Sequence, residues 1–161
     1  MTTLEVTSNK ILDHKVLGNR LAMWRFLNNK IVFTNGCFDI LHRGHIEYLS
    51  QSRDRGAVLI IGLNSDASVN RIKGEGRPVQ DEMSRALVLA SLRIVDAVVL
   101  FDEDTPYELI KLVKPDVLVK GADYTEDTIV GADIVRANGG EVVTIPIVEG
   151  YSTSKILNFK F

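Results

Sequence analysis

The chain has little of what marks several classes of protein. It contains one cysteine and four prolines in 161 residues, so it has neither a disulfide framework nor the composition of a collagen-like fibre. A lone cysteine favours a reducing compartment, and we expect the cytoplasm. No apolar run approaches the ~18 residues of a membrane helix. The first ten residues also lack the apolar core of a signal peptide.

A strong charge of either sign is absent as well. The formal net charge is −2, which argues against general nucleic-acid binding. Apolar residues make up 45% of the chain and charged residues 25%, the mixture found in ordinary globular proteins. The length fits one domain. We therefore expect a single domain that binds neither a membrane nor a nucleic acid.

Short apolar runs alternate with segments of helical period. The runs predict five β-strands, at 31–35, 57–63, 96–101, 116–121 and 141–146. Because the runs are continuous, they are typical of parallel strands buried on both faces. Helices are predicted at 44–55, 80–94, 105–113, about 127–138, and from 152 onward. The pattern predicts an α/β fold: a single Rossmann-like domain with a five-stranded parallel sheet and helices on both faces.

Residues 1–30 form a predicted N-terminal amphipathic helical extension, and residues 31–161 form the domain proper. The helix expected at 13–29 carries Trp24 and Phe26 on its apolar face, which would pack on the sheet or on a neighbouring subunit. This face and the open sheet edges predict a homodimer or a larger homo-oligomer. Residues 64–79 predict a short helix followed by a mobile loop.

The segment that leaves the first strand is the best candidate for a ligand site, because open parallel sheets bind ligands beyond the carboxyl ends of their strands. It reads NGCFDILHRGH, residues 35–45. His42 and His45 lie three residues apart at the start of the predicted helix, so both point to one side. Imidazoles and helix N-terminal amides together suit an anion. A buried histidine pair and half of a metal site are the alternatives. His14 is the only other histidine and Cys37 the only cysteine, which argues against zinc.

The string GCFDILHRGH resembles the signature of the nucleotidyltransferase superfamily that carries an H-x-G-H motif. EGYSTSKI, at 149–156, is similar to the late G-x-S-T element of this superfamily, although Ser-Thr-Ser before a helix can also be a simple cap. Four further strings resemble the bacterial adenylyltransferases that make ADP-heptose: GLNSDASV, KGEGRPV, FDEDTP and VLVKGADY. Ile147 stands where glycerol-phosphate cytidylyltransferases carry an arginine.

The resemblance implies that AMP passes from ATP to D-glycero-β-D-manno-heptose 1-phosphate, giving ADP-heptose and pyrophosphate for lipopolysaccharide or surface-glycan synthesis. A phosphate monoester is already an anion at neutral pH. Catalysis therefore needs positioning and charge stabilisation rather than a general base. Mg²⁺ would be held mainly by the phosphates of ATP. The alternatives are a cytidylyltransferase acting on a polyol or glycerol phosphate, and a nucleotide-binding module without catalysis.

The resemblance also assigns roles to individual residues. His42, His45 and Lys73 are the expected catalytic residues. The expected nucleotide-binding residues are Gly36, Cys37, Phe38, Gly44, Arg85, Gly121, Ser152, Thr153 and Ser154. The expected acceptor-binding residues are Asp39, Asn64, Arg77 and Asp123, and Asp66 is a candidate magnesium contact. Some have simpler explanations: Lys73 as a solvated loop residue and Asn64 as a turn residue. Likewise, Arg85 could serve a helix surface or a dimer contact, and Asp123 could cap a turn.

Overall fold

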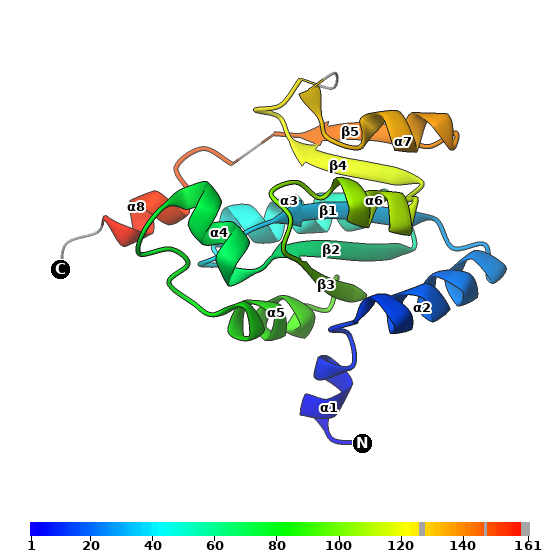
Figure 1. Ribbon diagram of the computed structural model, residues 1–161, viewed down its shortest axis with the longest axis horizontal. Coiled ribbons are helices and arrows are strands. Elements are labelled where there is room, and N and C mark those ends of the chain that lie inside the picture. Colours follow the sequence, from blue (N-terminus) through cyan, green and yellow to red (C-terminus); the bar gives the residue numbers. More distant parts are fainter. Residues whose placement is uncertain (126–127, 147, 159–161) are drawn as a thin grey trace.

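The computed structural model describes residues 1–125, 128–146 and 148–158. Five parallel strands form one sheet in the order β3-β2-β1-β4-β5 (Figure 1). The strands are β1 (Ile31–Gly36), β2 (Val58–Asn64), β3 (Ala97–Phe101), β4 (Val117–Gly121) and β5 (Glu141–Ile145). The expected α/β fold is confirmed, and each strand lies within one residue of its predicted bounds. The strand order reverses between β1 and β4, which is where such sheets bind ligands.

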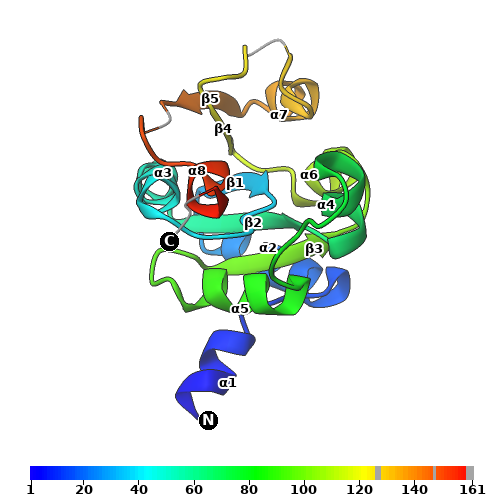
Figure 2. The same cartoon turned by 90° about the vertical axis from the view of Figure 1, so that its left-hand side faces the viewer.

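Helices cover both faces of the sheet, as Figure 2 shows. One face carries α3 (Arg43–Arg53) and α5 (Glu82–Ser91). The other carries α2 (His14–Phe26), α6 (Tyr107–Val113) and α7 (Ala132–Ala137). Two short helices, α4 (Asp66–Lys73) and α8 (Thr153–Leu157), lie toward the carboxyl ends of the strands. None of the helices that the structure describes has the length and apolarity to cross a membrane.

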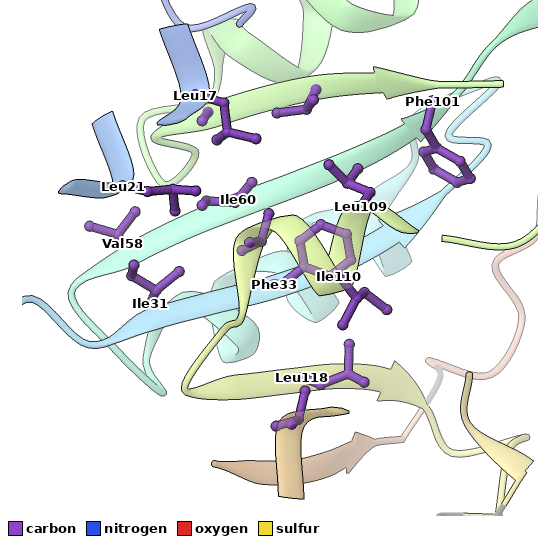
Figure 3. Packing of buried hydrophobic residues seen from close by; sticks show 14 of the residues in the cluster. Leu17, Leu21, Ile31, Phe33, Val58, Ile60, Phe101, Leu109, Ile110 and Leu118 are labelled. Carbon is purple, nitrogen blue, oxygen red and sulfur yellow. The ribbon is translucent and has the colours of Figure 1, made fainter. Parts of the chain in front are cut away.

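Alternate residues of each strand enter the two halves of the core. Phe33 and Leu118 pack with Leu109 and Ile110 of α6 (Figure 3). Val32 faces the other half of the core. Because helices cover both faces, every residue of β2 is buried. This explains why the strands read as unbroken apolar runs in the sequence.

The N-terminal segment is built into this core. Leu17, Leu21 and Trp24 of α2 are buried in the same cluster as Phe33. Phe26 is 86% exposed, so the expectation that it shares the buried face with Trp24 is wrong. At 3.6 residues per turn, a residue two positions on lies about 200° around the helix axis, on the opposite side.

The chain before α2 also pairs with the sheet. The amide of Leu12 donates to the carbonyl of Val98 over 2.9 Å, and the amide of Val98 donates to the carbonyl of Lys10 over 2.8 Å. This covers part of the β3 edge. Helix α2 also buries its apolar face within its own chain. The two grounds for expecting an oligomer, an apolar helix face and open sheet edges, are therefore both weakened. The homodimer stays a prediction.

Leu17→Ala measures how far this extension belongs to the folding unit. Leu17 is fully buried, so its truncation should lower the free energy of unfolding by about 2–5 kcal/mol. Urea titration gives this difference. Val16→Ala is the matched control: Val16 is 40% exposed, and its loss should change stability by less than about 0.5 kcal/mol. Equal stability of both variants would contradict a shared core.

Candidate nucleotide-binding site

A cavity of about 690 Å³ opens at the carboxyl ends of the strands. All predicted site residues except Asp66 and Arg85 line it: Gly36, Cys37, Phe38, Asp39, His42, Gly44, His45, Asn64, Lys73, Arg77, Gly121, Asp123, Ser152, Thr153 and Ser154. Segments from both ends of the chain therefore meet here. In Figure 2 the viewer faces this end of the sheet, with α3 and α8 on one side and α4 and α6 on the other.

His42 and His45 stack on each other in this cavity. Their ring centroids lie 3.8 Å apart, with 23° between the ring planes. His42 is the residue before α3, and its carbonyl accepts the amide of His45 over 2.9 Å. A side chain on Gly44 would place its Cβ 3.1 Å from the His42 ring and 3.3 Å from the Cβ of Tyr151. Glycine at this position is thus what lets the helix begin directly beneath the histidine pair.

The loop from β1 holds the second ring from the other side. Phe38 meets His45 edge to face, with centroids 5.3 Å apart. A Cβ on Gly36 would lie 2.9 Å from the Phe38 ring. The roles expected for Gly36 and Phe38 therefore include shaping the pocket around His45.

The surroundings of both imidazoles favour their neutral forms. Burial lowers the pKa of His42. Burial and the neighbouring His42 lower the pKa of His45 to about 4. Within the described residues, the Nδ1 atoms of these two rings are the buried side-chain nitrogens and oxygens without a hydrogen-bond partner. A bound anion would supply a partner and favour the protonated rings.

The start of α8 forms the facing wall. Ser152 caps this helix, since its Oγ accepts the amide of Lys155 over 3.2 Å. The simple capping explanation therefore holds for Ser152. The amides of Thr153 and Ser154 are in the first turn, where no intrahelical acceptor exists. Two helix N-termini thus border one cavity, and each carries partial positive charge.

Lys73 ends α4 at the rim of the cavity. It forms no hydrogen bond or ion pair with any residue that the structure describes. Beyond it, Gly74 and Gly76 have φ values of 91° and 79°, a backbone region that glycine enters without strain. No atom lies within 4 Å of a Cβ built on either glycine. The short helix is where the sequence predicted it, and the mobility of the following loop stays a prediction.

Asp39 anchors the far end of that loop. Its buried carboxylate accepts Arg77 Nε over 2.7 Å and the amides of Val79 and Gln80 over 2.9 and 3.1 Å. Burial acts to raise the pKa of Asp39, but these hydrogen bonds and the charge of Arg77 outweigh it and leave the pKa below its ordinary value. Asp39 and Arg77 line the cavity, yet they bind each other. Their contacts with the acceptor stay a prediction.

Arg85 and Asp66 are not among the residues that line the cavity. Arg85 is 1% exposed, so it serves neither a helix surface nor a dimer contact. Its guanidinium donates to the carbonyls of Cys37 and Asn64 over 2.7 and 2.9 Å and to the carboxylate of Asp66 over 2.8 Å. These contacts hold the guanidinium of Arg85, and they use one carboxylate oxygen of Asp66, whose side chain is 42% exposed. Nucleotide binding by Arg85 and magnesium binding by Asp66 stay predictions.

The cavity offers no protein cage for a metal. In the part of the chain that the structure describes, no three His, Cys, Asp or Glu side chains are grouped to hold one. A divalent metal that arrives with a phosphorylated ligand can instead be held by phosphate oxygens and water.

Sequence reasoning missed several residues of the lining, among them Asn35, Tyr48, Lys120, Tyr124 and Tyr151. A signal existed for Lys120, because it is a charge at the end of the apolar run VLVKG. Ile147, and the helix start expected at residue 127, lie outside the described residues.

A stacked histidine pair between two helix N-termini, at the switch point of a parallel sheet, defines a nucleotide-binding α/β domain. Residues 33–159 match the family described as cytidylyltransferase-like. The chain belongs to this family, which confirms the resemblance to the H-x-G-H nucleotidyltransferases.

Curated relatives are more than half identical to the chain over the segment that aligns. The bifunctional protein HldE of Rhodopseudomonas palustris (strain BisA53) is 57% identical over 88% of this chain and 29% of its own length. The bifunctional protein HldE of Caulobacter vibrioides is 55% identical over 92% of this chain and 31% of its own length. The chain thus spans about three tenths of the relatives that it matches.

Known structures agree with the fold. The lipopolysaccharide core biosynthesis protein from Thermoplasma volcanium GSS1 is 32% identical, with a TM-score of 0.60, over 74% of this chain and 97% of that one. The pantoate-beta-alanine ligase of Francisella tularensis has a TM-score of 0.68 over 93% of this chain and 73% of that one. At 17% identity, it is a likeness of fold alone.

Asp39→Asn tests whether this carboxylate fixes the loop. The substitution removes the charge that accepts Arg77 and two amides, and should lower the free energy of unfolding by about 2–3 kcal/mol. Hydrogen exchange at residues 74–80 should become faster. In the parent protein this contribution is fully present above the ordinary aspartate pKa of 3.8, and it is lost as the pH falls through the lowered pKa of the folded state.

The control is Glu108→Gln, which breaks the exposed ion pair with Lys111 and should leave stability nearly unchanged. Exchange at 74–80 that is equally slow in Asp39→Asn and the parent protein would contradict the anchoring role.

Proposed function

We propose that the chain is a sugar-phosphate adenylyltransferase that transfers AMP from ATP to D-glycero-β-D-manno-heptose 1-phosphate. The observation that carries the proposal is the stacked His42–His45 pair with unpartnered Nδ1 atoms, facing a second helix start. Such a site suits an anion with several phosphates better than a neutral ligand. The names of the HldE relatives and of the lipopolysaccharide core protein support the choice of acceptor.

In the proposed arrangement, the first turn of α8 holds the β- and γ-phosphates of Mg-ATP. His42 and His45 donate hydrogen bonds to the α-phosphate and to the bridging oxygen that leaves with pyrophosphate. Lys73 reaches the phosphates from the rim, where no group of the described residues holds it. Asn64 and Asp123 face the acceptor hydroxyls. The histidines act by stabilising charge that grows in the transition state.

The reaction needs no base from the protein. An oxygen of the acceptor phosphate forms a bond to the α-phosphorus, and the bond to the α,β-bridging oxygen breaks. The electron pair leaves with pyrophosphate. The products are ADP-heptose and pyrophosphate, so atoms and charge balance without a further reactant.

Pyrophosphate release from each of the four nucleoside triphosphates, measured against heptose 1-phosphate, mannose 1-phosphate and glycerol 3-phosphate, tests this proposal. We expect ATP with heptose 1-phosphate to give the highest kcat/KM. Faster reaction of CTP with glycerol 3-phosphate would replace the proposal with a cytidylyltransferase. If no combination of nucleotide and acceptor releases pyrophosphate and the protein still binds ATP, the chain is a binding module.

His45→Ala, checked for native folding by circular dichroism, completes this assay. Loss of a group that acts mainly in the transition state should lower kcat by ~10²-fold or more, with a smaller effect on KM. Unchanged turnover would contradict the role of the histidine pair.

A further inference from the structure

Lys120 is a cation of the cavity that the mechanism above leaves unused. It lies near the end of β4, and its Nζ donates to Oδ1 of Asn35 near the end of β1. The ammonium also lies 5.6 Å from the centre of the Tyr124 ring. The pairing of Phe33 with Leu118 sets the two strands side by side. Asn35 and Lys120 follow two residues later, at the point where the strand order reverses.

The charge of Lys120 has no direct carboxylate partner. No acidic oxygen of a described residue lies within ion-pair distance of its Nζ, whereas Lys30, at the other end of the sheet, contacts Glu141 over 2.8 Å. Burial lowers the pKa of Lys120 to about 8, against the opposing effects of Asp123 and Cys37. A desolvated ammonium without a counterion is costly. A bound anion would remove this cost.

Lys120 also lies across the strand ends from the histidine pair. Alternation along β4 places it on the face of Leu118, which α6 and α7 cover, whereas α3 covers the opposite face. Asp123 and Tyr124 line the cavity beside it. In the proposed arrangement, the two helix starts and Lys73 bind the phosphates of ATP. Lys120 lies apart from them, and its position therefore suits a second anion.

We propose that Lys120 binds the phosphate of the acceptor sugar and holds its attacking oxygen against the α-phosphorus of ATP. This inference rests on the proposed function. Two anions must come into contact when the acceptor oxygen bonds to the α-phosphorus and pyrophosphate departs. A fixed cation on the acceptor side reduces their repulsion. Asn35 sets the direction of the ammonium.

Kinetics of Lys120→Met separate this role from a structural one. The variant should raise KM for the sugar phosphate at least tenfold and change KM for ATP less than twofold. Lys120→Arg, which keeps the charge, should restore part of the acceptor affinity. Lys30→Met, which removes a cation remote from the cavity, should match the parent protein. Equal increases in both KM values for Lys120→Met, or a Lys120→Arg variant no better than Lys120→Met, would overturn the proposal.

Lysine acetylation read by mass spectrometry tests the same site without turnover. The parent protein is first saturated with Mg²⁺ and α,β-methylene-ATP, which should protect Lys73. Mannose 1-phosphate or inorganic phosphate, added next, should protect Lys120, whereas mannose should not. Lys30 should be modified equally throughout. Protection of Lys120 by the nucleotide alone, or by none of the probes, would overturn the assignment. Protection by the phosphates in a protein that releases no pyrophosphate would support the anion site and reject the proposed function.

Discussion

The geometry of the cavity depends on the buried guanidinium of Arg85. Its nitrogens bind carbonyls just after β1, at the end of β2 and just before α5, and a carboxylate at the start of α4. Each of these bonds is charge-assisted, which makes it strong and directional. The four segments that surround the cavity floor are thereby held at fixed separations. Arg85 contributes to the site as a positioning residue, without reaching its surface.

On this floor the chain places two uncharged rings where an anion is expected. Burial keeps His45 neutral until a negative charge arrives, and the glycine at position 44 allows the two rings to stack at the start of α3. A permanently charged pair would repel itself and would need counterions. Neutral imidazoles avoid this cost and still donate hydrogen bonds. Proton uptake on nucleotide binding follows from the same arrangement.

Much of the fold could be predicted from the sequence, because continuous apolar runs are a direct consequence of a parallel sheet covered on both faces. The histidine pair could also be predicted from the sequence, since a three-residue spacing at a helix start places both side chains on one side of the helix. The roles of Asp39 and Arg85 could not. A charged side chain beside a motif can bind the ligand or hold the loops that form the site, and only the hydrogen-bond partners distinguish these cases. For Asp39 the partners are Arg77, Val79 and Gln80, about forty residues away in the sequence.

Phe26 and Lys120 show two further limits. Apolar residues at 23, 24, 26 and 27 cannot all share one helical face, and the sheet selects Trp24. Lys120 becomes significant only when strand pairing places it beside Asn35, and strand order is not readable from a single chain. Local sequence patterns therefore identified the helices and strands and the pair of His42 and His45. The remainder of the site depends on contacts between distant segments.

The pKa of His45 is the most direct test of the central claim, that two neutral imidazoles form the phosphate site. Nitrogen-15 NMR titration of the imidazoles should give a pKa near 4 for His45 in the free protein, well below the ordinary 6.5. With Mg²⁺ and α,β-methylene-ATP bound, the negative charge of the phosphates should raise this pKa. A pKa near 6.5 in the free protein, or one that the nucleotide leaves unchanged, would contradict the account.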